Sequence, residues 1–357
     1  MRFSSLRARG LRCFTSVDYA PVPLVNLIHG PNGSGKTSLL EAMHLVSFGK
    51  SFLTPKAGDL LKQGEDVLWI EARVQEITNY GPAGITVRKS RSETDIRFDG
   101  QAVTSASALA RHMPLLVVNS RAPDLLGENP ANRRALVDRS LFHVKPSYVD
   151  TWKHYRHALR QRNELLQASG RGNAQADYWE SVLATLSVTI DEQRSALIEA
   201  INARLVDHGI ASFVNQTLRF HYSPGWDRQQ GLAAQLLANR ERDTSLGYTF
   251  AGPHRADLSL QLDGRAAARR LSRGQAKAVV CLVMVAIAQF IRSQSQACPV
   301  MLVDDLAAEM DEDMMRLAVD AVLALETQCF FTAIKPADLR SFLPEATSEF
   351  HVEHQTH

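Results

Sequence analysis

The chain has 357 residues, of which 45% are hydrophobic and 22% charged, and this composition predicts a soluble globular protein with two lobes or domains. Its net charge is only +2, which excludes a protein that captures nucleic acid through the charge of the whole molecule. We expect neither membrane insertion nor export, because the apolar run 279–291 ends at Arg292 and no signal-peptide core follows Met1. The four cysteines lie far apart without a pairing pattern, which predicts reduced thiols and a cytoplasmic protein.

Short strands separated by turns are predicted for residues 1–120. The pair Asp99-Gly100 indicates a tight hairpin turn, because both residue types tolerate the left-handed backbone that such a turn needs. The expected strands are 3–9, 24–28, 67–74, 84–88, 95–98 and 115–119.

A phosphate loop of the pattern G-x-x-x-x-G-K-[ST] lies between the strand 24–28 and a helix predicted for residues 38–48. Backbone N–H groups of the glycine turn and of the helix N-terminus can surround a phosphate, and glycine allows the close approach. Lys36 is expected to reach the β- and γ-phosphates, and Thr37 to bind Mg²⁺. The loop consists of Gly30, Pro31, Asn32, Gly33, Ser34, Gly35, Lys36 and Thr37. The sequence therefore predicts binding of a nucleoside triphosphate.

Residues 131–242 change in character and are predicted to be helical. Apolar side chains recur every three or four residues over 149–166 and again over 178–206, which indicates two amphipathic helices joined by a turn at 169–173. The pattern is too short for an extended coiled coil, so we expect two packed helices in a second lobe. Basic residues exceed acidic ones between Arg121 and Arg171, which is compatible with a solvated face or with a polyanionic partner.

The last part of the chain returns to mixed structure. We expect a strand at 258–262 that turns at Asp263-Gly264, a strongly apolar helix at 274–291, a strand at 299–304, a helix at 312–325 and a final strand at 328–333. The strands around the phosphate loop and Asp304 are expected to form one mixed sheet that draws on both ends of the chain.

Two carboxylates follow the apolar strand 299–304. A buried parallel strand that ends in Asp is typical of the acidic partner of a phosphate loop. Asp304 is expected to hold the Mg²⁺ shell, and Asp305 to orient or deprotonate the attacking water, with Lys36 as the other catalytic residue.

A second helix start also suits a phosphate. Ser272 occupies the N-cap position of the helix 274–291, and Gly274 allows a ligand to approach the backbone next to Gln275. One triphosphate needs two such cradles only if they face each other across a dimer of the chain.

The phosphate loop, the helical insertion, the run Leu-Ser-x-Gly-Gln and the hydrophobic run before Asp304-Asp305 together resemble the ATP-binding-cassette heads that act on DNA. Among these heads the chain is most similar to the bacterial RecF family, over its full length. Runs 132–138, 252–258 and 304–311 also match, and the run Gly-Pro-His-Arg-x-Asp-Leu at 252–258 is the most family-specific.

The resemblance implies an α/β fold with an ABC-type P-loop ATPase head. Lobe I, a mixed sheet with helices, would comprise 1–120 and 245–357, and a mainly helical lobe II of 121–244 would be inserted into it.

The same resemblance implies an ATP-dependent DNA-binding protein of recombinational repair and replication-fork maintenance, linked to the SOS response. An ATP-induced homodimer would clamp DNA at single-strand gaps or junctions and help to load recombinase, together with RecR/RecO-type mediator proteins. Ser272, Gly274 and Gln275 would contact the nucleotide bound by the other subunit. The Asp305 carboxylate in place of Glu, and the lack of a histidine after 331–333, fit slow ATP hydrolysis used as a switch.

Alternatives remain for the function and for several residues. A transport-type ATPase subunit that docks on a membrane permease, a small-molecule kinase and a structural chromosome head use the same loop. The pair Arg133-Arg134 either solvates the helix that begins after Pro130 or contacts a nucleic-acid backbone. His254 is either structural or functional, and Arg255 either contacts phosphate or pairs with Asp257.

Overall fold

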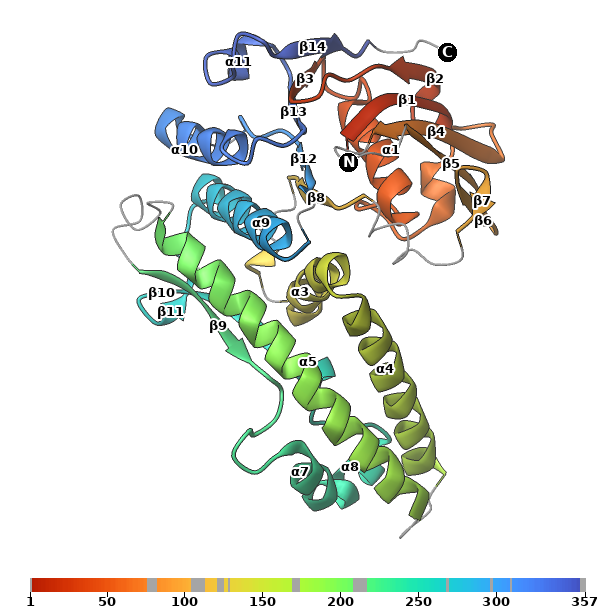
Figure 1. Ribbon diagram of the computed structural model, residues 1–357, viewed down its shortest axis with the longest axis vertical. Helices are drawn as coiled ribbons and strands as arrows, with labels where there is room; N and C mark the ends of the chain where they lie inside the picture. The colour runs from red at the N-terminus through yellow and green to blue at the C-terminus, as the bar shows by residue number, and fades with distance from the viewer. Residues whose placement is uncertain are drawn as a thin grey trace. The chain divides into compact units, whose positions relative to one another are not determined.

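The computed structural model describes residues 2–75, 82–103, 113–120, 125–127, 129–168, 174–207, 217–267, 270–295, 298–308 and 310–353. The chain divides into two compact units (Figure 1). Residues 1–123 and 271–357 form the first unit, and residues 124–270 form the second, which is inserted into the first along the sequence. The turn expected at 169–173 lies outside the described residues.

An antiparallel sheet forms the N-terminal part of the first unit, with the strand order β2-β1-β4-β5-β6-β7. At its end, Asp99 and Gly100 have φ angles of 46° and 79° and join β6 to β7, which confirms the expected hairpin. The strands are β1 (Arg2–Leu11), β2 (Phe14–Tyr19), β4 (Val67–Gln75), β5 (Ala83–Ser90), β6 (Thr94–Phe98) and β7 (Gln101–Ala102).

A second sheet in the same unit is entirely parallel among its described strands, in the order β14-β3-β13-β12-β8. The strands are β3 (Val25–His29), β8 (Leu115–Val118), β12 (Val300–Val303), β13 (Cys329–Ala333) and β14 (Ser348–His351). The strands beside the phosphate loop and Asp304, β3 and β12, thus belong to one sheet that draws on both ends of the chain, as expected, but this sheet is parallel among its described strands and not mixed. Strands β2 and β14 are not among the predicted elements.

Helix α1 (Lys36–Phe48) packs between the two sheets, and its buried residues share one core with both. Helices α9 (Arg273–Ser295) and α10 (Glu312–Leu323) pack against each other, and α9 also contacts β8. The short elements η1 (Ala57–Leu60) and α11 (Ala337–Arg340) complete the unit. By length and composition α9 could span a membrane, contrary to our expectation. However, 89% of the most apolar 18-residue stretch of this helix is buried inside the protein. It is a core helix.

The second unit is built on two long helices, α4 (Pro146–Gln167) and α5 (Ala174–Asp207), that pack side by side as expected. Shorter helices surround them: α3 (Pro130–Val144), α7 (Leu232–Ala238), α8 (Arg240–Leu246) and η3 (Pro253–Arg255). A small antiparallel sheet has the order β11-β10-β9, with β9 (Leu218–Ser223), β10 (Asp257–Leu262) and β11 (Arg265–Ala266).

Two expectations for this region differ from the structure. The stretch 131–242 is not wholly helical, because β9 interrupts it and pairs with β10 along its full length. That pairing also places residues 245–270 in the second unit, whereas the sequence analysis assigned them to lobe I. The turn Asp263-Gly264 has φ angles of 46° and 75° and joins β10 to β11 as predicted.

Candidate functional site

The phosphate loop connects the end of β3 to the start of α1. Gly30 has φ 149°, and a Cβ atom there would lie 2.2 Å from the backbone oxygen of Val352, just after β14. Gly35 is the left-handed N-cap of α1, with φ 112°, and a Cβ there would meet the Phe14 ring at 2.5 Å. Only glycine fits these two positions, because both the backbone conformation and the neighbouring atoms exclude a side chain.

Polar groups of the loop are arranged to accept an anion. The Lys36 ammonium donates to the carbonyl oxygens of Gly30 and Pro31 at 2.7 and 2.9 Å, so it lies folded over the loop. Partial burial is the main cause that lowers the pKa of Lys36. The hydroxyl of Ser34 is buried and has no hydrogen-bond partner among the described residues. A phosphate group would supply counter-charge and acceptors to these groups.

The acidic side chains after β12 lie next to this loop. The Thr37 hydroxyl donates to the carboxylate of Asp304 at 2.9 Å, and the Thr332 hydroxyl donates to the same carboxylate at 2.7 Å. Burial is the main cause that raises the pKa of Asp304, and the two threonine hydrogen bonds oppose it. The Asp305 backbone N–H donates to the Thr332 hydroxyl at 2.7 Å, so β13 positions both acids.

Asp305 is held in a strained position beside these groups. Its φ angle is 52°, in the left-handed region that non-glycine residues rarely adopt. The ammonium of Lys277, a buried residue of α9, donates to the carbonyl oxygen of Asp305 and, at 3.5 Å, to that of Ala308. The helix that begins next to Ser272 therefore also holds the turn that carries the candidate catalytic acid.

Two more residues complete this end of the site. Arg12 follows β1 and donates to both carboxylate oxygens of Glu41, at 2.8 and 2.9 Å. Glu41 is fully buried on α1, and its hydrogen bond is the main cause that raises the pKa of Arg12. The ammonium of Lys62 donates to the carbonyl of Cys13 at 3.2 Å.

The phosphate loop, the two acids after β12, Arg12 and Lys62 contribute to the lining of one cavity of about 550 Å³. Three cations and three carboxylates contribute to its wall, together with the glycine turn. The lining residues are Arg12, Cys13, Asn32, Gly33, Gly35, Lys36, Thr37, Ser38, Asp59, Leu61, Lys62, Gln63, Asp304 and Asp305. The structure thus brings together the predicted phosphate loop and the predicted acids, which are 267 residues apart in the case of Thr37 and Asp304.

Sequence reasoning missed several residues at this site. The sequence did contain a signal for Lys277, because a lysine inside an apolar helix needs a hydrogen-bond acceptor in the protein interior. Thr332 had one as well, since parallel strands that are neighbours end at the same edge of the sheet. Arg12 had none, because nothing local relates the turn after β1 to the phosphate loop.

The second predicted cradle does not reach this cavity. Ser272, Gly274 and Gln275 are not among its described lining residues. Ser272 is exposed, and its side chain and that of Gln275 form a reciprocal cap, with N···O distances of 3.2 and 2.9 Å. Ser272 is therefore the helix cap that the sequence predicted, and it presents its end of α9 to solvent.

The basic pair of α3 takes part in the packing of the second unit. Arg133 is buried and donates to both carboxylate oxygens of Asp257, at 2.8 to 3.0 Å, so Asp257 pairs with Arg133 and not with Arg255. Arg134 is half-buried and donates to the carbonyl of Ala256 at 2.7 Å. These contacts favour the structural interpretation of Arg133 over contact with a nucleic-acid backbone.

His254 is also held by neighbours. Its Nδ1 atom lies 2.6 Å from the Tyr155 hydroxyl and its Nε2 atom 2.9 Å from the Thr249 carbonyl oxygen. Burial is the main cause that lowers the pKa of His254 to about 4. A neutral ring with both nitrogens engaged favours the structural interpretation.

The donor set near Thr37 fits Mg²⁺ and not a metal held by the protein alone. Among the described residues, no group of three or more His, Cys, Asp or Glu side chains is placed to bind a metal ion. Mg²⁺ usually takes one or two protein ligands and keeps water or phosphate oxygens for the rest. The Thr37 hydroxyl and the Asp304 carboxylate, 2.9 Å apart, match that requirement.

Comparisons with known proteins show the family and the fold of the chain. Residues 2–356 match the family described as RecF/RecN/SMC N terminal domain. The chain is 36% identical to the DNA replication and repair protein RecF of Thioalkalivibrio sulfidiphilus, covering 100% of this chain and 99% of that one. It is 36% identical to the protein of the same name from Chromohalobacter salexigens, covering 99% and 98%.

A solved structure shows the same fold. It is described as the recombination mediator protein RecF-ATP in the RecFOR pathway, with a TM-score of 0.86, 20% identity, and coverage of 99% of this chain and 96% of that chain. The predicted fold class, an α/β ATPase head with an inserted helical lobe, is confirmed.

Proposed function

The chain belongs to the RecF family of the RecF/RecN/SMC group, and we propose that it is an ATP-switched DNA-binding protein of recombinational repair and replication-fork maintenance. Family membership supports the DNA role over a transport-type ATPase subunit, because the relatives are named for DNA replication and repair.

The observation that carries the proposal is the contact between Thr37 and Asp304. It joins the phosphate loop to the acid after β12, as ATP hydrolysis with Mg²⁺ requires. Thr37 and Asp304 would hold Mg²⁺, which supplies charge neutralisation at the phosphates when it is bound. Lys36 would leave the carbonyl oxygens of its own loop and bind the phosphates.

Asp305 is the candidate that orients the attacking water. Asp305 lines the cavity, and its backbone is fixed by Thr332 and Lys277. We propose that ATP hydrolysis is slow, because the short Asp305 side chain must reach the attacking water from a backbone that is already fixed. The ATP-bound state would then last long enough to act as a switch.

The dimer is proposed from the position of α9. Ser272 is exposed and caps this helix outside the cavity of its own chain, so we place the nucleotide of a second copy at this helix start, where the buried Gly274 and the half-buried Gln275 follow. ATP bound in both composite sites would stabilise the dimer. If DNA binds the dimer better than the monomer, the free energy of ATP binding would also favour DNA binding.

The partners follow from the family. We propose DNA with a gap or a single-strand/double-strand junction, RecR/RecO-type mediator proteins, a role in loading recombinase, a link to the SOS response, and a cytoplasmic location. In support, the solved RecF structure is described as a recombination mediator of the RecFOR pathway.

Sedimentation velocity with ATP, with ADP and without nucleotide tests the composite site. We expect dimers only with ATP, and none for Ser272→Arg, because the larger side chain blocks the approach of a second nucleotide. Ser293→Arg is the matched control, since Ser293 is exposed at the other end of α9. ATP-dependent dimers that survive Ser272→Arg would contradict the proposal.

A further inference from the structure

We propose that an exposed surface of the second unit, made of Arg242, Tyr248, Phe250 and Arg255, binds unpaired bases of single-stranded nucleic acid. This Arg–aromatic surface rests on the DNA-binding function proposed above and assigns the single-stranded arm of the substrate to it. All four side chains belong to residues that are exposed.

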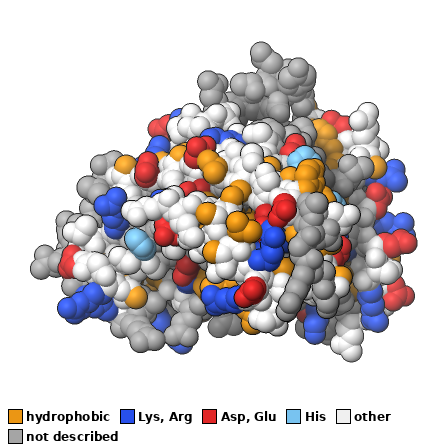
Figure 2. Space-filling view, turned by 90° about the horizontal axis from the view of Figure 1, so that it is seen from below, with side chains coloured by type: hydrophobic (Ala, Val, Ile, Leu, Met, Phe, Trp, Pro, Cys, Tyr) orange, Lys and Arg blue, Asp and Glu red, His pale blue; other side chains and the backbone are white. Residues whose placement is uncertain are grey.

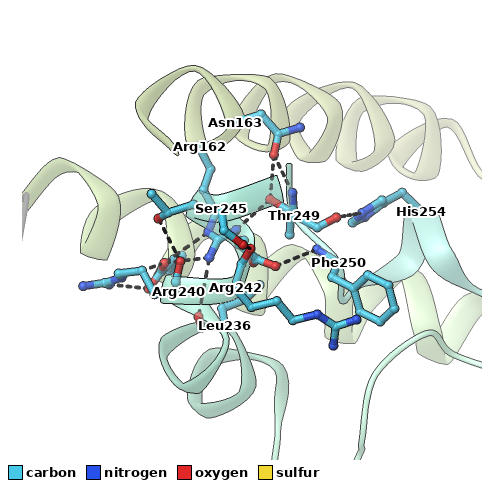
Figure 3. Close-up of polar contacts among 12 residues, drawn as sticks. Arg162, Asn163, Leu236, Arg240, Arg242, Ser245, Thr249, Phe250 and His254 are labelled. Atoms are coloured by element: carbon cyan, nitrogen blue, oxygen red, sulfur yellow. Dashed lines mark hydrogen bonds and ion pairs between the residues drawn. The ribbon is translucent and has the colours of Figure 1, made fainter. Parts of the chain in front are cut away.

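The two arginines are placed on the aromatic rings. The Arg242 guanidinium lies 3.8 Å from the centre of the Phe250 ring, and that of Arg255 lies 5.0 Å from the Tyr248 ring and 5.8 Å from the Phe250 ring. Figure 3 shows Arg242 extended beside Phe250. Neither arginine has an ion pair with an acid among the described residues, so like charges gather on Phe250 without compensation. Such a cluster favours an anionic partner.

A buried polar network fixes this surface in place. The Thr249 N–H donates to the side-chain oxygen of Asn163 at 2.9 Å, and the Phe250 N–H donates to the carboxylate of Asp243 at 3.1 Å. Arg162, which is fully buried, donates to both Asp243 and Thr249 at 2.7 Å. The segment that carries the two rings is therefore preorganised, which lowers the entropic cost of binding.

A basic hollow of about 540 Å³ adjoins the same segment. Its wall shares Asn163 and Gln167 with the network, and Gln167 donates to the carbonyl of Gly247 at 2.9 Å. Arg156 and Arg160, one helical turn apart on α4, also line the hollow and have no ion pair among the described residues. The full lining is Arg156, Leu159, Arg160, Asn163, Glu164 and Gln167.

Single-stranded nucleic acid fits this chemistry better than a protein does. Arginine and aromatic side chains are also enriched at protein interfaces, but a single strand supplies an anionic phosphate and an unpaired base at every nucleotide, which match the guanidinium groups and the rings together. Aromatic rings and guanidinium planes stack on unpaired bases of any sequence, and free arginines contact the phosphates. Figure 2 shows Lys/Arg and Asp/Glu side chains interspersed on the face in view.

Binding is tested by fluorescence anisotropy with labelled oligothymidine and with a duplex of equal length, using the full chain with ATP. We expect Tyr248→Ala with Phe250→Ala to lower the affinity for oligothymidine about tenfold or more and to leave duplex affinity within about twofold, because only unpaired bases stack. Tyr178→Ala, which removes an exposed ring with no guanidinium above it in the part of the chain that the structure describes, is the aromatic control and should change neither.

The arginines are tested through salt dependence. Arg242→Gln with Arg255→Gln should lower the salt slope for oligothymidine by about 1.4, since each phosphate contact to a single strand contributes about 0.7. The control Arg219→Gln with Arg265→Gln removes the same charge from exposed positions of β9 and β11 and should leave the slope unchanged.

Three results would overturn the inference. Unchanged affinity of the aromatic variant for oligothymidine would do so, and so would an equal loss for duplex. Binding of polyglutamate that depends on Tyr248 and Phe250 would assign the surface to an acidic polypeptide. If the unaltered chain binds duplex or junction DNA and the aromatic variant still binds oligothymidine, the assignment of the Arg–aromatic surface fails but the proposed DNA-binding function stands. If the unaltered chain binds no DNA with ATP, the proposed function fails as well.

Discussion

Replacing Arg162 with Met removes a cation from the interior of the helical unit. Arg162 is fully buried, and it donates to the carboxylates of Asp243 at 2.7 Å and of Glu180 at 3.1 Å. It also donates to the Thr249 hydroxyl at 2.7 Å and the Leu236 carbonyl at 3.4 Å (Figure 3). Met has a similar length but no donor, so four acceptors lose a hydrogen bond.

The expected loss of stability depends on which carboxylates remain buried without a partner after Arg162 is removed. Glu180 keeps Arg240 as a partner at 2.5 Å, whereas Asp243 is fully buried and keeps only the Phe250 N–H among the described residues. Breaking a buried pair by removing one partner costs about 3–5 kcal/mol, because a charge stays in the interior without compensation. We expect Arg162→Met to lower the free energy of unfolding of this unit by that amount.

Urea unfolding followed by tryptophan fluorescence measures the loss, since Trp152, Trp179 and Trp226 all belong to the helical unit. The double variant Arg162→Met with Asp243→Asn should recover at least about 1 kcal/mol, because Asn is neutral and can still accept from Phe250. Lys153→Met is the control on the same helix. Its partner Asp150 is 3.8 Å away and both are exposed, so the change should stay within about 0.5 kcal/mol.

A loss below about 1 kcal/mol for Arg162→Met would refute the reasoning, because it would mean that the Asp243 charge is relieved without its arginine. Additive losses in the double variant would refute it too, since the two side chains would then not be coupled.

Three further predictions concern single residues. Gly30→Ala should abolish measurable binding of a fluorescent ATP analogue, because its Cβ would lie 2.2 Å from the Val352 carbonyl oxygen. The control Gly58→Ala, whose Cβ would have nothing within 4 Å, should bind the analogue normally. Equal affinities of the two variants would contradict the role of the glycine turn in phosphate binding. Lys277→Met should slow ATP hydrolysis about tenfold or more and leave ATP affinity within about twofold, because a charged hydrogen bond to the turn of Asp305 is lost; a parallel loss of affinity in nucleotide titrations would argue against this role. The free energy of unfolding of the helical unit should fall by about 3 kcal/mol as the pH decreases from about 6.5 to about 4. The pKa of His254 is lowered in the folded chain, so the unfolded chain takes up a proton at a higher pH than the folded chain does. This part of the pH dependence, measured by urea titrations, should vanish in His254→Gln.

The phosphate loop was predictable because its determinants are contiguous. Strand, glycine turn and helix follow one another over residues 25–48, so local rules place Lys36 and Thr37 correctly. The acid after β12 was also predictable, since an apolar run that closes on Asp304 marks a strand end. The two hairpin turns at Asp99 and Asp263 follow from residue type alone.

Contacts made by chain folding were not predictable in this way. Lys277 reaches Asp305 across 28 residues, and Arg12 reaches Glu41 across 29, without a local pattern that relates them. Arg133 looked like a free surface arginine, but it pairs with Asp257, which is 124 residues away. The exposed rings of Tyr248 and Phe250 lie in a segment without periodicity, so their grouping needed the structure.

The position of β3 has a consequence for biosynthesis. Its two neighbours in the parallel sheet, β13 and β14, are the last strands of the described chain, and the backbone after β14 closes against Gly30. A growing polypeptide on the ribosome thus holds the glycine turn long before the strands that support it have been translated. We therefore expect the chain to bind ATP only after β13 and β14 have been translated, and products truncated before these strands should not bind it.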